Sequence, residues 1–252
     1  MSINLQEKKK ISLIRQEIIE INYLKKAAHL GSCLSCVEML YASFKYLKPN
    51  FENLIFSKGH AALAYYATLK HFNKKLLAHN YLKIGGQYWA HITKDLNNKI
   101  YYSFGSLGYG LGITAGMAYG NKKKKYICIL SDGELNEGSI WESFWFLSHY
   151  KLNNISVLID MNNLQSFGKT KEILDINYYK IIKSLNINIY NINGHDYKKI
   201  FKILSIKTIF PKVIFCNTIK GKGVESIENK ISSHYFPASK KDLKIFKKKN
   251  EK

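Results

Sequence analysis

Residues 126–138 read YICILSDGELNEG, an apolar run that ends in a turn of small and acidic residues. A second apolar run, at residues 155–160, ends in the same manner, in MNNLQ at 161–165. Short runs of this kind, bounded by turn residues, are typical of buried strands. The residues between them, 139–149, have the apolar spacing of a helix. A strand, a helix and a strand in this order predict two parallel neighbouring strands.

The alternation continues on both sides of this unit. Glycine-rich residues 105–120 predict a loop that enters a helix of small residues. We predict one α/β domain over residues 1–239, with a mostly parallel sheet and helices on both faces, and a basic C-terminal tail over 240–252. No internal repeat or Pro/Gly/Ser-rich linker divides the chain. The further elements expected are helices at 10–28, 35–47, 61–72 and 197–204 and strands at 187–192 and 212–219.

The large positive charge does not indicate a nucleic-acid partner. The chain of 252 residues carries 39 basic and 18 acidic residues, a formal charge of +21, but Arg15 is its only arginine. Proteins that read nucleic acids rely on arginine for bidentate contacts to phosphate and guanine. The abundance of Lys, Ile, Asn and Tyr beside three prolines indicates AT-rich codon usage instead. The lysines at 122–125 are expected to be solvated.

Membrane insertion, export and disulfide or zinc chemistry are not expected either. No apolar run reaches about 18 residues, and residues 1–10 lack the apolar region of a secretory signal, so the cytoplasm is the expected location. Cys33 and Cys36 form a C-x-x-C, but no second pair follows, and Cys128 and Cys216 lie singly in apolar runs. We interpret all four cysteines as small buried residues.

The turns after the two apolar runs carry side chains that suit a metal–phosphate site. Asp132 and Asn162 follow consecutive predicted strands, so both are expected at the same edge of the sheet. A carboxylate and an amide oxygen are hard ligands for Mg²⁺ or Ca²⁺, which phosphate oxygens commonly complete. Gly133 lets the backbone approach an anion closely. Each turn alone is commonplace; the pair, about thirty residues apart, is far more specific.

Five segments occur in the order in which they stand in one enzyme family. They are SKGHAA at 57–62, GSLGYGLG at 105–112, DGELNEG at 132–138, GHD at 194–196 and TIKGKG at 218–223. Together they span nearly the whole chain, and the unit from Asp132 to Asn162 resembles a motif shared by many thiamine-diphosphate enzymes. The chain is similar to the N-terminal, diphosphate-binding part of transketolase. This resemblance implies a thiamine-diphosphate-binding fold.

The resemblance also assigns roles to particular residues. The metal ligands it implies, for Mg²⁺ or for Ca²⁺ in its place, are Asp132, Asn162 and the carbonyl of Leu164. The cofactor contacts it implies are those of His60, Gly105, Leu107, Asp132, Gly133, Glu137 and Asn162. Glu137 also matches a residue that meets its counterpart across a subunit interface. The catalytic residues it implies are His29, His60, His91 and His234, because imidazole exchanges protons with substrate oxygens near neutral pH.

Several positions depart from the usual family wording. AHLGS at 28–32 stands where GHPGG is common, Ile92 follows His91 in place of proline, and Ser131 replaces a glycine. Tyr109 replaces a common glutamine, and Ser233 and Tyr235 flank His234 where tryptophan and glycine are typical. Each change keeps the ligand atom or imidazole but alters the backbone freedom around it. Weakened activity or a narrower choice of substrate therefore stays open.

A complete transketolase is more than twice as long as this chain. The resemblance implies that a second domain supplies a glutamate for cofactor activation and arginines for sugar phosphates. We therefore expect the N-terminal subunit of a split transketolase of the pentose phosphate pathway, active with a C-terminal partner subunit in a heterotetramer. The alternatives are another thiamine-diphosphate enzyme, such as 1-deoxyxylulose-5-phosphate synthase, or a degenerate, non-catalytic scaffold.

Overall fold

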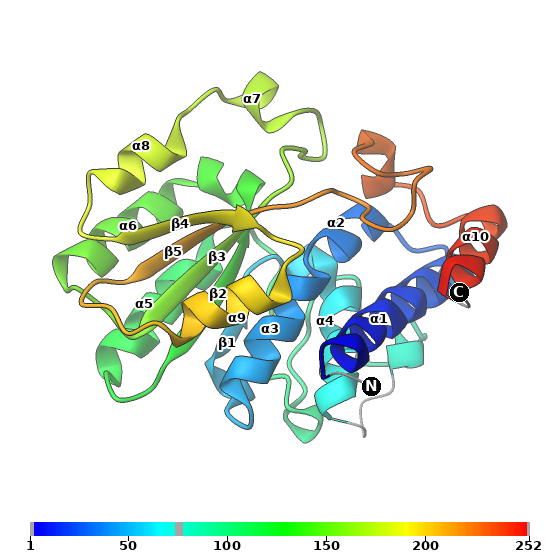
Figure 1. The fold of residues 1–252 in the computed structure, drawn as a ribbon, viewed down its shortest axis with the longest axis horizontal. Coiled ribbons are helices and arrows are strands. Elements are labelled where there is room, and N and C mark those ends of the chain that lie inside the picture. Colours follow the sequence, from blue (N-terminus) through cyan, green and yellow to red (C-terminus); the bar gives the residue numbers. More distant parts are fainter. Residues whose placement is uncertain (1–2, 74–77, 251–252) are drawn as a thin grey trace.

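The computed structural model describes residues 3–73 and 78–250. A five-stranded sheet lies at its centre, in the order β1-β2-β3-β5-β4 (Figure 1), and all neighbouring strands are parallel. The strands are β1 Leu54–Phe56, β2 Tyr126–Ser131, β3 Ile155–Met161, β4 Asn188–Asn193 and β5 Lys212–Asn217. The predicted parallel α/β sheet is confirmed.

Helices cover both faces of the sheet, as predicted (Figure 1). The first face packs against α1 Ile3–Lys25, α2 Leu30–Ser35, α3 Val37–Leu47, α4 Ala62–Phe72 and α9 Tyr197–Ser205. The second packs against α5 Tyr109–Gly120, α6 Gly138–His149 and α8 Tyr178–Lys183. Within β2, Ile127 and Ile129 point to the first core and Cys128 and Leu130 to the second. This alternation follows from the two-residue period of a strand, and burial on both faces explains the unbroken apolar runs.

The register of β2 and β3 determines where the candidate ligands lie. Ser131, the last residue of β2, pairs with Asp160 of β3. The two strands therefore end at the same level, and their following loops leave the sheet side by side.

Several elements differ from those expected. β1 was not predicted, because three apolar residues are too few to show a strand period. The helix expected over 35–47 is α3, which begins at Val37, and the short helix α2 that precedes it, joined to α3 at Cys36, was not predicted. α1 begins at Ile3 rather than near residue 10, and the short helices α7 Thr170–Ile173 and α8 were not predicted.

The basic segment over 240–252 is not a solvated tail in the part that the structure describes. It forms α10 Lys240–Asn250, which packs against α1. Phe246 is buried, and Lys247 forms an ion pair with Glu20 of α1 at 2.8 Å. A Leu and a Phe three residues apart give this lysine-rich helix one apolar face, which α1 covers. A run of charges hid that short apolar pattern.

All four cysteines are buried and free, which confirms their interpretation as core residues. Burial raises the pKa of the Cys33 thiol to about 11 and those of the other three further. None of the helices in the described ranges combines the length and apolar character that crossing a bilayer requires.

Candidate functional site

A cavity of about 240 Å³ lies at the carboxyl edge of the sheet. In parallel α/β sheets this edge is where ligands bind, because the loops that follow the strands surround it. Its lining includes ten of the eleven residues predicted for the site: His29, His60, His91, Gly105, Leu107, Asp132, Gly133, Asn162, Leu164 and His234. The structure thus brings together residues that are up to about two hundred positions apart in the sequence.

The predicted metal ligands lie in the loops after β2 and β3. Asp132 is buried, and its Oδ2 accepts hydrogen bonds from the Asn163 N–H at 2.6 Å and the Thr170 hydroxyl at 3.2 Å. Oδ1 of Asn162 accepts from the Leu164 N–H at 3.1 Å. These bonds fix the loops, and Asp132, Asn162 and Leu164 all line the cavity.

The charge on Asp132 is disfavoured without a cation beside it. Burial, and then the nearby carboxylate of Asp160, raise the pKa of Asp132 to about 7, although Lys58 and Lys220 act against this rise. A divalent cation would offset both unfavourable terms, because an opposite charge at close range stabilises the ionised form. The environment therefore suits a metal ligand.

A buried ion pair anchors Lys58, which lines the cavity. Lys58 and Asp160 are both buried and hydrogen-bonded, and Lys58 also donates to the Ser32 carbonyl at 2.9 Å. Ser35 donates to Asp160 at 2.5 Å, and Thr218 donates to its other oxygen. Burial opposes the charge on Lys58, but Asp160 holds the pKa of this ammonium above its usual range. The pair thus joins α2, the loop after β1, β3 and the end of β5.

Lys220 is a site residue that the sequence did not reveal as one. Its ammonium donates to the carbonyl of Leu164 at 3.0 Å. Burial, and then the charge on Lys58, lower the pKa of Lys220 to about 8. Lys58 and Lys220 lie in the segments SKGHAA and TIKGKG. Nothing in those segments alone indicates that the two ammonium groups lie at the cavity. Ser32, Ser131, Gln165 and Ser166 also line the cavity and were not predicted.

The four predicted histidines form one cluster. The ring centroid of His29 lies 5.5 Å from that of His60, 5.9 Å from that of His91 and 4.8 Å from that of His234. The His29 N–H donates to the carbonyl of His234 at 2.8 Å, which joins the start of α2 to the C-terminal region. His29 itself has φ of 65°, a conformation that is uncommon for residues other than glycine. Such strained positions are concentrated at functional sites.

Three of these histidines, His29, His60 and His234, have pKa values that keep them neutral near neutral pH. Burial lowers the pKa values of His29 and His234 to about 4 each, with neighbouring cations as a second cause. Burial, and then the charge on Lys58, lower that of His60 well below its usual value. A neutral imidazole carries both an acceptor and a donor nitrogen. These rings can therefore accept or donate a proton or hydrogen bond at a ligand oxygen.

Glu137 is the one predicted site residue that does not line the cavity. It precedes α6 and lies against Gly108, where φ is 84° and a Cβ would be 2.8 Å from the Cβ of Glu137. Its neighbour Glu134 lies deeper and accepts from the N–H groups of Ser131 at 2.8 Å and Gly108 at 3.2 Å. Glu134 thereby connects the end of β2 to the loop that enters α5.

The cavity fits a metal-bound diphosphate by the chemistry of its atoms. Three buried side-chain nitrogens of its lining have no hydrogen-bond partner, namely Nδ1 of His29, Nδ1 of His234 and Nε2 of Gln165. A Cβ on Gly105 would meet nothing within 4 Å, so space for a ligand remains there. Over residues 3–73 and 78–250, no three His, Cys, Asp or Glu side chains form a metal site. The ligands that suit a cation in this cavity are therefore protein oxygen atoms together with phosphate oxygens of a bound ligand.

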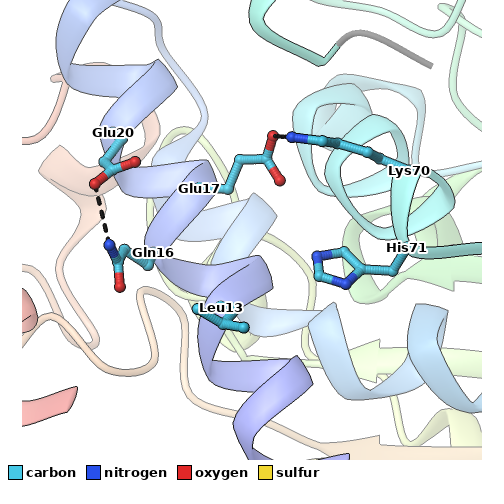
Figure 2. A pocket seen from close by; sticks show the side chains of 6 residues that line it. All are labelled: Leu13, Gln16, Glu17, Glu20, Lys70 and His71. Atoms are coloured by element: carbon cyan, nitrogen blue, oxygen red, sulfur yellow. Dashed lines mark hydrogen bonds and ion pairs between the residues drawn. The ribbon is translucent and has the colours of Figure 1, made fainter. Parts of the chain in front are cut away.

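A wider hollow of about 440 Å³ lies between α1 and α4 (Figure 2). Figure 2 shows four of its polar side chains in pairs, Lys70 with Glu17 and Gln16 with Glu20. The two pairs are 2.5 and 3.1 Å apart. Two carboxylates in the lining disfavour a phosphate ligand. The hollow is therefore larger than the cavity at the sheet edge, but its side chains are not arranged in a way that indicates catalysis.

Comparison with known proteins connects the chain to one enzyme family. The family model "Transketolase, thiamine diphosphate binding domain" matches residues 6–251. The chain is 31% identical to human transketolase over 246 residues, which cover 90% of this chain and 39% of that enzyme. It is 30% identical to one of the subunits of apulose-4-phosphate transketolase from Phocaeicola vulgatus over 241 residues, which cover 88% of this chain and 85% of that relative. The chain thus spans about two fifths of its human relative.

Solved structures share the fold at lower sequence identity. Transketolase from Campylobacter jejuni superposes with a TM-score of 0.85 at 22% identity. The match includes all of this chain and 43% of the Campylobacter chain. Transketolase from Leishmania mexicana gives 0.84 at 18% identity, with 42% of its length covered. These likenesses concern the fold alone. The family model covers nearly the whole chain. The protein therefore belongs to the transketolase family, and the chain corresponds to the thiamine-diphosphate-binding domain of that family.

Proposed function

We propose that this chain is the cofactor-holding subunit of a two-chain transketolase, which transfers a two-carbon ketol unit between a ketose phosphate and an aldose phosphate. One observation carries the proposal: the loops after β2 and β3, the glycine-rich loop before α5 and four histidines line a single cavity. Oxygen ligands for a cation, donors for phosphate and neutral imidazoles for proton exchange are thus present together.

The metal and the diphosphate would be held at the carboxyl ends of β2 and β3. Asp132, the Asn162 side chain and the Leu164 carbonyl would ligate Mg²⁺, with Ca²⁺ as a substitute, and the two phosphates would complete its shell. Lys220 would then share its ammonium between the carbonyl it contacts and a phosphate oxygen. Gly105 and Leu107 would border the organic rings of the cofactor. When bound, thiamine diphosphate supplies an electron sink for cleavage and formation of the carbon–carbon bond.

The histidines would handle protons and hold the sugar. Their depressed pKa values keep His29, His60 and His234 neutral, so that each can hydrogen-bond a hydroxyl or carbonyl oxygen as donor or acceptor. The unpartnered Nδ1 atoms of His29 and His234 are free for such contacts. General acid–base assistance of this kind typically contributes about 10²–10⁴ in rate.

Exposed apolar side chains around the cavity support a partner subunit. Phe167, Tyr235 and Phe236 are 87%, 50% and 66% exposed and adjoin the lining residues Ser166 and His234 in the sequence. Apolar groups grouped at a surface commonly indicate a binding face. We propose that the C-terminal transketolase subunit covers this rim and supplies the groups that this chain lacks, in a heterotetramer of two copies of each.

The face of α5 supports contact with a further chain. Its exposed side carries Tyr109, Ile113 and Tyr119 with Gly112 and Gly116 between them, and no charged residue. A helix that is uncharged on every side is usually buried. We propose that two copies of this chain meet there, close to Glu137.

Sugar phosphates are the proposed substrates, and the apulose-4-phosphate transketolase relatives suggest one of them. Apulose 4-phosphate, which those relatives carry in their name, is the second candidate donor beside the ketose phosphates of the pentose phosphate pathway. We propose no nucleic-acid role, since the lone arginine is buried and paired.

A reconstitution experiment tests the proposal. The chain is assayed with thiamine diphosphate and Mg²⁺, alone and with the complementary C-terminal subunit, using ribose 5-phosphate as acceptor and either xylulose 5-phosphate or apulose 4-phosphate as donor. Turnover is expected only with the partner. Turnover by the isolated chain would refute the two-chain proposal. Activity with pyruvate as donor would favour the deoxyxylulose-phosphate synthase alternative, and failure to bind the cofactor would favour the scaffold.

A further inference from the structure

The only arginine of the chain joins α1 to three other segments of the fold. Nη1 of Arg15 donates to the carbonyl of Leu34 at 2.6 Å and to that of Lys222 at 2.9 Å. Nη2 contacts both carboxylate oxygens of Glu38, at 2.7 and 2.5 Å. A lysine has one nitrogen on a flexible stem and cannot match this fork of contacts. The position therefore requires arginine in a chain that otherwise uses lysine for every permanent positive charge.

His195, from the GHD motif, extends the same network. Its Nδ1 lies 3.1 Å from Oε2 of Glu38, and its Nε2 accepts the N–H of Ile219 at 2.9 Å. Since Nε2 is an acceptor, the ring proton is on Nδ1 and is donated to Glu38. The imidazole thus transmits the position of the Arg15–Glu38 pair to the first residues after β5.

The segment that this network holds carries a cavity residue. Lys220 follows Ile219 directly, and its ammonium reaches the Leu164 carbonyl at 3.0 Å. Lys222, whose carbonyl binds Arg15, lies two residues further on. Gly221 between them donates to the carbonyl of Gly31, beside the His29 turn. Neither Arg15, Glu38 nor His195 lines the cavity.

We propose that Arg15, Glu38 and His195 are positioning residues, which hold residues 218–223 so that Lys220 stays beside the carbonyl of Leu164 in the cofactor site. The functional meaning of this position rests on the proposed function; the network itself does not. Loss of the His195 contact leaves the part-buried N–H of Ile219 without its acceptor and frees the segment to move.

Four variants of the chain test the inference. His195→Ala and Arg15→Lys break the network. His195→Gln retains one acceptor for Ile219 and one donor for Glu38. Lys212→Met is the matched control, because Lys212 is buried and donates to three carbonyls at the end of α9, at the opposite end of β5. Each is measured for melting temperature, for amide exchange of the peptide over 218–223, and by calorimetry for thiamine diphosphate at fixed Mg²⁺.

The expected result separates positioning from general stability. His195→Ala and Arg15→Lys should weaken cofactor binding by about tenfold and speed exchange at 218–223, as the loss of one buried hydrogen bond implies. His195→Gln should lie within about threefold of the parent chain, and Lys212→Met should lower the melting temperature yet change neither readout. If Arg15→Lys does not fold, His195→Ala decides, because it leaves the ion pair intact.

Two outcomes would overturn the inference: parental binding and exchange in His195→Ala, or an equal loss of binding in Lys212→Met. If the parent chain itself binds no cofactor, the proposed function fails. The exchange measurement then still tests whether the network holds the segment.

Discussion

The backbone N–H of Asn163 lies 2.6 Å from Oδ2 of Asp132, so the loop after β3 donates directly to the carboxylate that follows β2. The two residues that this bond joins are thirty-one positions apart in the sequence. The bond holds the two candidate metal-ligand loops in contact from within the protein itself. A binding site that is organised in advance loses less entropy when its ligand arrives.

Removal of Asp132 should abolish cofactor binding without unfolding the chain. Asp132→Ala removes the acceptor of the Asn163 N–H and the Thr170 hydroxyl, but it also removes a buried charge whose pKa is raised to about 7, so the melting temperature of the free chain should fall only modestly. With thiamine diphosphate and Mg²⁺ at 100 times the dissociation constant, the parent chain should gain about 2.7 kcal/mol. Asp132→Ala and Asn162→Ala should gain none, whereas Asp175→Ala, at an exposed carboxylate, should behave as the parent. A full ligand-induced shift in Asp132→Ala would contradict the metal site.

Loss of the His29 imidazole should reduce turnover far more than cofactor binding. In the enzyme reconstituted with its partner, His29→Asn should lower kcat by about 10²–10⁴, because a neutral acid–base group is lost from the reacting atoms. The thermal shift on adding cofactor should persist. His149→Asn, on the exposed end of α6, is the control. A kcat within threefold of the parent would remove His29 from the catalytic set.

The buried histidines should make the chain sensitive to acid. The pKa values of His29 and His234 are about 4 in the fold, below the unfolded value of about 6.5. Between these values the unfolded chain binds more protons, so stability is complete above about pH 6.5 and falls as the pH drops toward 4. Asp132, with its raised pKa, acts in the opposite direction.

The difference between variant and parent isolates the histidine term. Urea unfolding of the parent and of His29→Asn/His234→Asn at pH 7.5 and 5 should show a smaller acid loss in the variant, by on the order of 1–2 kcal/mol. Equal pH dependence in both chains would mean that these imidazoles are not protonated on unfolding.

Two glycines of α5 should respond oppositely to alanine. A Cβ on Gly116 would meet nothing within 4 Å, so Gly116→Ala should stabilise the isolated chain by up to about 1 kcal/mol through helix propensity. It should also weaken self-association, measured by analytical ultracentrifugation, if another chain packs closely there. A Cβ on Gly110 would overlap Ser57, so Gly110→Ala should destabilise the chain. Unchanged association in Gly116→Ala would argue against the α5 face as an interface.

The sequence revealed most of the fold because its strands are apolar and its turns distinctive. β2 and β3 were predictable to within a residue, since burial on both faces requires unbroken apolar runs. β1 escaped because it is only three residues long. α10 was not predicted because its two apolar side chains, Leu243 and Phe246, become an apolar face only when α1 packs against them. Local patterns show what a segment can form, but contacts with distant segments decide marginal cases.

The residues of the cavity divide in the same way. Asp132, Asn162 and the histidines could be proposed from the sequence because their chemistry and their motifs are visible there. The roles of Lys58, Lys220, Glu134 and the Arg15–Glu38–His195 network could not, because each depends on a partner far away in the chain. By itself the sequence determined the order of the four longer strands, β2 to β5, and the side chains that follow β2 and β3. Only the tertiary structure decided which buried charges meet, because the cost of burying a charge is relieved by its neighbours in space rather than by its neighbours in sequence.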